Sequence, residues 1–335
     1  MRYPRKILAG VVLLSGLMAG TAFASAWHFK LVDKIPLPNA KGHGDFVRYD
    51  PTDGMIYVSL PNGGVAVDSH TNKVVHHWKS IPAPNSHASD AHYVYWTAAQ
   101  GPGKTNQIVV ISKKTWKIVN RVTTVGTSPD GMWLDPMTHK LYVAMDDNNW
   151  VDVYSTGKDP KFETKFPLVP TKGSGPDVGR LVASKNVLYM PDDSWEESLN
   201  ASTGQITHKV NLHIKVTKLD GTKGQIYDPK TNAVWVGTTT AGVYVFNADT
   251  LKVLKHLSAK SGIDEVEWDP KLGLVYAFEG AGKGFNVYDA NTMKPVTFVS
   301  TGVGLTHTGT VDLKTHNVYA YAGLAGSLYV YKPEK

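Results

Sequence analysis

The sequence predicts an all-β fold: a seven-bladed β-propeller made of four-stranded antiparallel blades. Three observations support it. A short strand motif recurs seven times, an Asp-Pro turn keeps register with that motif, and no long helical periodicity appears after residue 26. The 335 residues are 42% hydrophobic and 19% charged, with 9 Trp, 16 Tyr and 9 Phe. This composition excludes a mainly disordered chain and is enough for a sizeable core.

Residues 1–26 are predicted to be a signal peptide that is removed. Three basic residues occupy the first six positions, the apolar run Ile7–Gly20 follows, and Ala24-Ser25-Ala26 provides the small residues of a cleavage site. The apolar run has about 14 residues, fewer than the ~20 that span a bilayer. We therefore expect a periplasmic or secreted protein, cleaved after Ala26, with no transmembrane anchor in the mature chain.

Charge and cysteine content narrow the function classes. The formal charge of +6 falls to +3 when the three basic residues of the leader are removed, which makes a nucleic-acid partner a weak prediction. The absence of cysteine excludes disulfides, c-type haem, thiolate zinc sites and cysteine nucleophiles. The sequence also lacks Gly-x-Ser-x-Gly, His-Glu-x-x-His and Walker motifs.

The recurring strand motif is an aromatic residue flanked by apolar ones. Its central aromatics are Tyr57, Tyr95, Tyr142, Tyr189, Trp235, Tyr276 and Tyr319. Their separations of 38, 47, 47, 46, 41 and 43 residues fit the ~40–50-residue period of propeller blades. An Asp lies seven residues before five of the aromatics, and in four cases Pro follows it, which is typical of a turn. A Gly/Asn-rich turn and two further strands complete each predicted blade.

The two ends of the mature chain are predicted to close the ring. The seventh repeat ends at Tyr331-Lys332, directly after its third strand, and therefore lacks an outer strand. The segment Phe29–Ile35 reads like the outer strand of the first repeat, so we expect it to complete the last blade. Residues 27–335 would then form a single propeller domain with only short, protected edges.

This repeat resembles that of the YVTN-repeat propellers, the YncE-like group of exported bacterial and archaeal proteins. The shared pattern is Asp-Pro-x-Thr-x-x-x-Tyr-Val, then an alternating strand, then Thr-x-Lys-Val. Its best matches are Thr138–Ala144 and Asn232–Gly237. The resemblance covers essentially the whole mature chain, although the second and fourth repeats depart from the pattern. It implies a propeller fold and export but no particular activity, because propellers host many functions.

Register places one residue of each repeat at the mouth of the predicted channel, twelve positions before the central aromatic. These residues are Asp45, Asp130, Asp177, Lys223, Asp264 and His307, with His87 the nearest similar side chain in the shorter second repeat and His43 beside Asp45. Converging carboxylates and imidazoles could bind a cationic ligand or a divalent metal ion, with His43, Asp45, His87, Asp130, Asp264 and His307 as candidate ligands. The alternative is that each Asp caps the turn that enters its strand.

Charged residues are also predicted to line the channel below the mouth. Nine positions before the aromatics stand Arg48, Trp133, Arg180, Ile226, Glu267 and Thr310. Arg48 and Arg180 would hold an anionic group of a ligand, while the acidic mouth selects what approaches. The alternative is a set of mutually paired charges around channel water.

Two neighbouring loops combine acidic residues with a tryptophan. They contain Asp146, Asp147 and Trp150 in the third repeat, and Asp192, Asp193 and Trp195 in the fourth. Because both loops are expected on the face that carries the mouth, they form our predicted docking surface for an exported protein partner. The alternative is that both loops are simply solvated.

Three functions remain open from the sequence, and no catalytic residue is assigned. The leading hypothesis is a binding protein that holds a small ligand, a metal ion or a protein partner on its acidic face. A lactonase-type hydrolase would use Glu267, His307, Arg48 and Asp264 as base, metal ligand and oxyanion clamp. Single-stranded nucleic-acid binding is the third hypothesis, and the acidic face argues against it.

Overall fold

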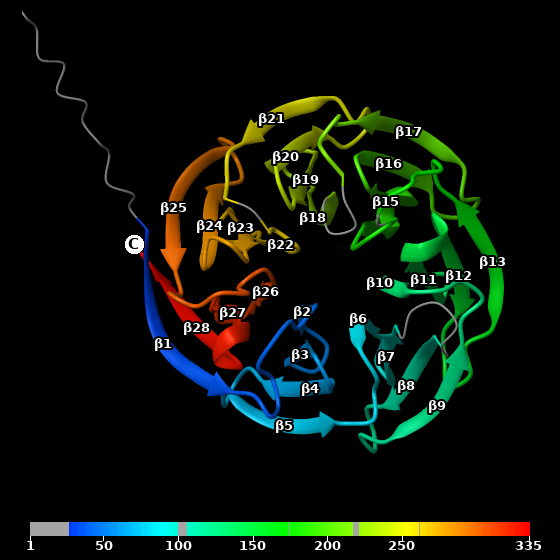
Figure 1. Cartoon of the computed structure of the whole chain (residues 1–335), viewed down its shortest axis with the longest axis horizontal. Helices are drawn as coiled ribbons and strands as arrows, with labels where there is room; N and C mark the ends of the chain where they lie inside the picture. The colour runs from blue at the N-terminus through cyan, green and yellow to red at the C-terminus, as the bar shows by residue number, and fades with distance from the viewer. Residues whose placement is uncertain (1–26, 100–105, 174, 217–220, 261) are drawn as a thin grey trace, which may run out of the picture.

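The computed structural model describes residues 27–99, 106–173, 175–216, 221–260 and 262–335. In these ranges seven four-stranded antiparallel sheets are arranged as a ring (Figure 1), which confirms the predicted all-β seven-bladed propeller. Helix in the described ranges is limited to three short 3-10 turns, η1 (Asp146–Asn148), η2 (Ala183–Lys185) and η3 (Gly323–Ala325). None of the helices described is long and apolar enough to cross a membrane. The predicted signal peptide lies outside the described residues.

Blades one to six are meanders whose strands run outward from the channel in chain order. Blade one consists of β2 (Val47–Asp50), β3 (Met55–Leu60), β4 (Gly63–Asp68) and β5 (Lys73–Trp78), and blade two of β6 (Pro84–Ser89), β7 (Tyr93–Ala98), β8 (Gln107–Ser112) and β9 (Ile118–Thr123). Blade three consists of β10 (Pro129–Asp135), β11 (Lys140–Met145), β12 (Trp150–Ser155) and β13 (Phe162–Pro167). Blade four consists of β14 (Arg180–Val182), β15 (Val187–Asp192), β16 (Trp195–Asn200) and β17 (Ile206–Asn211). Blades five and six are β18 (Thr222–Asp228), β19 (Ala233–Thr238), β20 (Gly242–Asn247), β21 (Val253–Leu257); and β22 (Val266–Asp269), β23 (Leu274–Glu279), β24 (Gly284–Asp289), β25 (Lys294–Ser300).

Blade seven joins the two ends of the described chain. Its inner strands are β26 (Gly309–Val311), β27 (Val318–Ala322) and β28 (Ser327–Glu334), and its outer strand is β1 (His28–Pro36). Strand β1 runs antiparallel to β28, with one irregularity in register after Leu31. Figure 1 shows the two strands side by side. The predicted closure by the N-terminal strand is therefore confirmed.

The Asp residues of the repeat cap the turn between the first two strands of their blades. The Asp50 carboxylate accepts hydrogen bonds from the backbone N–H and the hydroxyl of Thr52. Equivalent carboxylate contacts with the following turn occur at Asp135, Asp228, Asp269 and Asp312. Each of these turns therefore brings the chain from the inner strand directly to the strand beside it.

The central tyrosines of three blades also connect their blade to the next one. The hydroxyl of Tyr142 donates to the backbone carbonyl of Ala201 in blade four, and that of Tyr189 donates to Ala248 in blade five. Tyr319 of blade seven likewise donates to Ser69 of blade one. A buried tyrosine needs a partner for its hydroxyl, and these carbonyls meet that need while fixing the spacing between blades.

The hydrophobic core lies between neighbouring blades. At the junction of blades seven and one, Ile35 of β1 is 3% exposed and belongs to the same apolar cluster as Val330 of β28 and Val67 of β4. The closing strand therefore stabilises the ring through apolar contacts with both blades as well as through hydrogen bonds with β28.

We expect Ile35→Ala to lower the free energy of unfolding by ~2–4 kcal/mol, because it leaves a cavity at the junction of blades seven and one. The matched control is Leu31→Ala in the same strand, where the side chain is 39% exposed and the expected loss is below ~1 kcal/mol. Denaturant unfolding followed by tryptophan fluorescence measures both losses. Equal losses would contradict a stabilising role for the buried face of β1.

Candidate functional site

A cavity of about 540 Å³ lies at one end of the channel. One residue from each blade lines it, just before or at the start of the inner strand: Asp45, Asn85, Asp130, Asp177, Lys223, Asp264 and His307. Equivalent positions meet here because the inner strands surround the channel and each is held in register with its neighbour in the blade. We call this cavity the mouth.

The second blade differs from the prediction because its first turn is shorter. In each blade the central aromatic pairs with one residue of the inner strand. In blade one that residue is Arg48, nine positions before Tyr57, whereas in blade two it is Ala88, only seven positions before Tyr95. The residue at the mouth is consequently Asn85 rather than His87. Sequence register missed Asn85 because the two-residue deletion falls within the turn and leaves the strand pattern unchanged.

His87 instead lies in the core between blades one and two, which corrects its placement as a candidate metal ligand. It is 1% exposed, and its ring lies within 5.2 Å, centroid to centroid, of the rings of Phe46, Tyr57 and Trp96. Neither ring nitrogen has a hydrogen-bond partner within the described ranges. Burial holds the pKa of His87 well below its usual range, so the ring is neutral.

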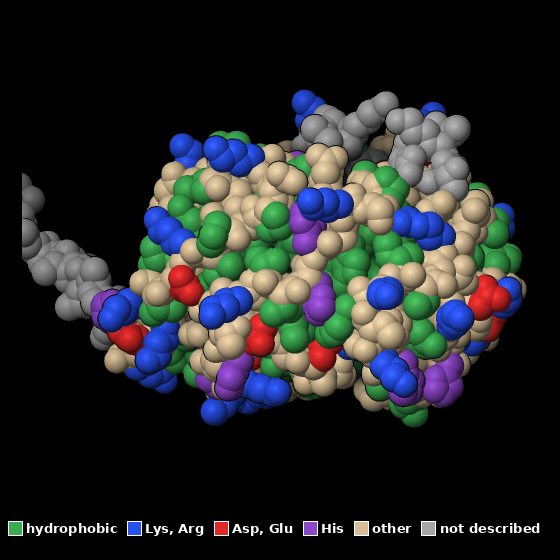
Figure 2. Space-filling view, turned by 90° about the horizontal axis from the view of Figure 1, so that it is seen from below, with side chains coloured by type: hydrophobic (Ala, Val, Ile, Leu, Met, Phe, Trp, Pro, Cys, Tyr) green, Lys and Arg blue, Asp and Glu red, His purple; other side chains and the backbone are tan. Residues whose placement is uncertain are grey.

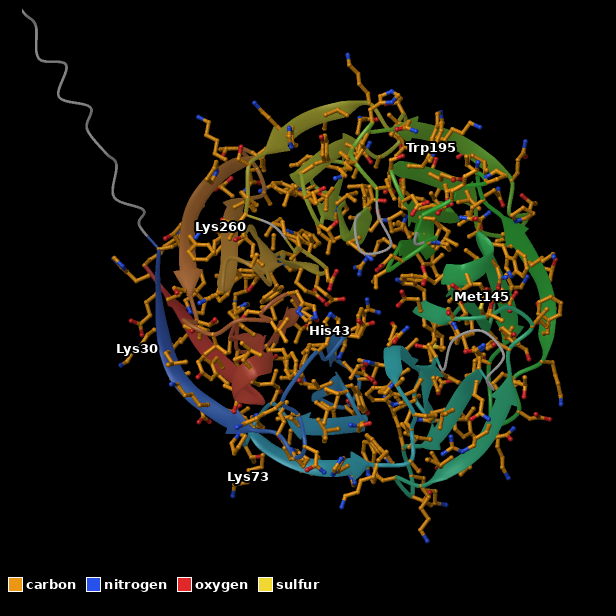
Figure 3. All side chains as sticks on the ribbon, in the orientation of Figure 1. Lys30, His43, Lys73, Met145, Trp195 and Lys260 are labelled. Atoms are coloured by element: carbon orange, nitrogen blue, oxygen red, sulfur yellow. The ribbon has the colours of Figure 1, made fainter. Side chains whose placement is uncertain are left out.

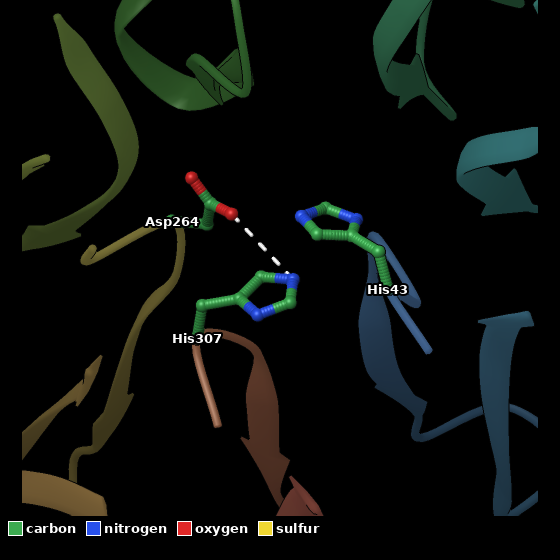
Figure 4. A group of neighbouring side chains, drawn as sticks. All are labelled: His43, Asp264 and His307. Atoms are coloured by element: carbon green, nitrogen blue, oxygen red, sulfur yellow. Dashed lines mark ion pairs between the residues drawn. The ribbon is translucent and has the colours of Figure 1, made fainter. Parts of the chain in front are cut away.

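His43, Asp264 and His307 come together on one side of the mouth (Figure 4), with one nitrogen or oxygen atom from each lying within 4.8 Å of the others. Nε2 of His307 is 3.6 Å from the Asp264 carboxylate, and the two imidazole rings stack with centroids 4.2 Å apart. Asp45 is next to the group, 3.6 Å from Nδ1 of His43. Asp130 lines the same cavity but lies outside this group.

His307 is the buried member of the group. Its side chain is 4% exposed, and its Nε2 has no hydrogen-bond partner among the described residues. Burial lowers the pKa of His307, although the Asp264 carboxylate and a hydrogen bond with the backbone of Gly44 oppose the shift. The ring nitrogen that faces Asp264 is Nε2, which makes no hydrogen bond to the described residues. Metal-binding histidines are commonly oriented in this way.

His43 is the exposed member of the group. Figure 3 places it at the inner end of blade one, facing the channel, whereas Lys30 and Lys73 lie on the outer edge of the ring. Its side chain is 59% exposed, so it can rotate without disturbing the packing of the blade.

Most of the ionisable side chains that line the mouth are carboxylic acids. Five carboxylates line it, from Asp45, Asp130, Asp146, Asp177 and Asp264. Burial and the neighbouring Asp264 raise the pKa of Asp45 to about 7, and burial and Asp177 raise that of Asp146 to about 8. Burial and the neighbouring Asp177 and Asp45 also raise the pKa of Asp130 well above its usual range. The carboxylates are therefore held where their ionisation is unfavourable, and a bound cation would relieve this.

Lys223 offsets only one of these charges. Its ammonium lies 2.5 Å from a carboxylate oxygen of Asp177, and both side chains are largely buried. Burial lowers the pKa of Lys223, but Asp177 and Asp264 outweigh it and raise the pKa above the usual range. The other four carboxylates have no lysine or arginine in direct contact among the residues that the structure describes.

The acidic loops of the third and fourth repeats do not form one exposed docking surface. Asp192 and Asp193 are buried: Asp192 accepts hydrogen bonds from Asn149, and Asp193 accepts two from backbone N–H groups. Asp146 of the other loop lines the mouth, and only Asp147 is exposed. The predicted surface is corrected accordingly, because contacts between blades three and four enclose most of its carboxylates.

Trp150 and Trp195 occupy equivalent positions in blades three and four, and both are half-buried. A lysine ammonium lies over each ring, 4.1 Å from the centroid for Lys165 over Trp150 and 5.6 Å for Lys209 over Trp195. These cation–π contacts give both tryptophan rings a structural role within their own blades.

Arg48 and Arg180 do not line the mouth. Extended chain rises ~3.3 Å per residue, so Arg48, three residues after Asp45, lies about 10 Å further along the channel. Both arginines line a second cavity of about 520 Å³. Glu267 is not among the lining residues of either cavity. The four residues of the lactonase-type hypothesis are therefore divided between separate places.

Comparison of the chain with protein-family models gave no match, and a search of curated proteins found no related sequence. The seven-bladed propeller and the arrangement of its mouth thus stand on the geometry described above.

The chelator-treated protein is expected to lose stability as the pH rises from about 4 to about 8. Asp146 has a higher pKa in the folded chain than its ordinary 3.8, so the folded state binds more protons than the unfolded state in this interval and each step up in pH favours unfolding. Thermal unfolding by circular dichroism should show the melting temperature falling by several degrees. Asp146→Asn should flatten this dependence, and an unchanged slope in that variant would contradict the assignment.

Proposed function

We propose that this protein is a non-catalytic binding propeller that holds a divalent metal ion at its mouth, between His43, Asp264 and His307. The observation that carries the proposal is the buried Nε2 of His307, which makes no hydrogen bond to any described residue and lies 3.6 Å from the Asp264 carboxylate, beside a second imidazole. An unsatisfied buried nitrogen is costly unless something binds it, and a metal ion would use all three side chains at once.

The donor set fits a borderline transition-metal ion better than Ca²⁺ or Mg²⁺. Two imidazole nitrogens and one carboxylate oxygen suit Zn²⁺, Co²⁺, Ni²⁺ or Cu²⁺, whereas the alkaline-earth ions prefer oxygen ligands alone. A tetrahedral ion with bonds of about 2.1 Å holds its ligand atoms about 3.4 Å apart. The atoms here lie within 4.8 Å, and rotation of the exposed His43 would close the difference. Asp45 is placed to accept a hydrogen bond from His43.

The remaining carboxylates of the mouth would strengthen cation binding. They attract a positive ion electrostatically, and the ion in turn would offset the repulsion among them. The rest of the cavity leaves room for a small ligand beside the metal, or for a side chain of a protein partner.

We further propose kinship with the exported YVTN-repeat propellers and a location in the periplasm or outside the cell. The support is the repeat pattern and the seven-bladed ring, together with the leader-like sequence of residues 1–26. Nucleic-acid binding has less support. The mouth is acidic, and over the edge of the disc seen in Figure 2 Lys and Arg side chains are scattered singly or in small groups and form no continuous basic groove on that face.

The protein purified without chelator should contain stoichiometric zinc or a similar ion by elemental analysis, and the chelated protein should rebind Zn²⁺ in calorimetric titrations. We expect His307→Ala to weaken Zn²⁺ binding by at least ~100-fold, because it removes the buried ligand. His208→Ala, a substitution of an exposed histidine on β17, is the matched control and should leave the affinity unchanged.

Two results would refute the metal site. One is a wild-type protein that neither retains nor rebinds Zn²⁺, Co²⁺, Ni²⁺ or Cu²⁺. The other is equal affinity in the His307→Ala and His208→Ala proteins, which would place binding elsewhere on the surface.

A further inference from the structure

The second cavity lies among the inner strands and first turns of blades one to four, beyond the mouth along the channel. Arg48 of β2 and Arg180 at the start of β14 both line it, together with Ala88 and Trp133 from the two blades between them. Ala88 contributes a small side chain to the lining, and Trp133 and Leu181 provide apolar walls. Its volume of about 520 Å³ suits a small organic molecule.

The two arginines lack direct partners. Within the described ranges neither guanidinium makes a hydrogen bond or an ion pair, and the Arg48 guanidinium carbon lies 4.5 Å from the centroid of the Phe46 ring. Burial and the positive charge of Arg48 both lower the pKa of Arg180, so the two groups repel each other in a partly desolvated place. Guanidinium groups in such surroundings normally pair with an anion.

The carboxylates nearest to the cavity are already engaged elsewhere. Asp50 forms an ion pair of 2.6 Å with Lys113 and also accepts hydrogen bonds from Ser89 and Thr52. Asp90 accepts hydrogen bonds from the backbone of its own turn and from a tyrosine hydroxyl. Neither acid is therefore free to neutralise an arginine.

Glu267 is the remaining acidic group that influences both arginines. Arg48 and Arg180 both act to lower its pKa, but its carboxylate comes within ion-pair distance of neither guanidinium. Burial raises the pKa of Glu267, and it raises that of the adjacent Glu265 well above the usual range. Glu267 thus provides neither guanidinium with a direct ion-pair partner.

We propose that the second cavity is a binding site for a small organic anion, whose carboxylate or phosphate group lies between Arg48 and Arg180 and whose apolar part packs against Trp133 and Leu181. The site is separate from the mouth and has the opposite charge preference. A ligand of this class would provide the hydrogen-bond acceptors that the two guanidinium groups lack.

The probes are benzoate and inorganic phosphate. Each is titrated into the protein (residues 27–335) at low ionic strength, and binding is followed by calorimetry. Benzoate should bind the wild type at millimolar concentration or below. Arg48→Gln and Arg180→Gln should each weaken binding by ~10-fold or more, because each removes a charged hydrogen-bond donor. Arg121→Gln, on the exposed strand β9, and His307→Ala, at the mouth, should bind as the wild type does. The tighter of the two probes identifies the preferred anionic group.

The stability of the ligand-free variants gives a second, independent test. Because each substitution removes one of two repelling charges and breaks no hydrogen bond or ion pair within the described ranges, both arginine variants should melt close to the wild-type temperature. A marked loss of stability would show that the guanidinium groups serve the fold and would overturn the proposal. Failure of the wild type to bind either probe, or unchanged binding in both arginine variants, would also overturn it.

Discussion

The pairing of β1 with β28 is the contact on which the rest of the structure depends. Propeller blades bury their apolar faces only against each other, so an open ring would expose the sides of its first and last blades. The candidate metal group spans this seam. His43 lies on the link that follows β1, His307 precedes β26 of blade seven, and Asp264 precedes β22 of blade six. Closing the ring is therefore also what assembles the site.

A second consequence of the architecture is the separation of charge along the channel. Each inner strand begins at the mouth and ends at the opposite face, so residues only three positions apart belong to different cavities. Asp45 contributes to the acidic mouth, and Arg48, from the same short segment, contributes to the second cavity. One ring of strands can in this way carry two sites with opposite charge preference.

The repeat spacing was sufficient to predict the blades, their strand order and the closing strand, because a regular period and a missing outer strand allow few alternatives. It also placed six of the seven residues at the mouth. The error at His87 arose from a turn shortened by two residues, which moves the register without altering the strand pattern. The burial of Asp192 and Asp193 could not be predicted, because it depends on contacts made by a neighbouring blade and its links. The position of Arg48 and Arg180 beyond the mouth was predicted, because register places each of them three residues further along the inner strand than the mouth residue of its blade.

The most direct test of the account is anomalous X-ray diffraction at the zinc absorption edge, from crystals of the protein loaded with Zn²⁺ after chelation. The account predicts one strong anomalous peak at the mouth, within bonding distance of His307 Nε2 and shared with His43 and Asp264. The absence of a peak there, or peaks only at exposed histidines on the outer strands, would contradict it.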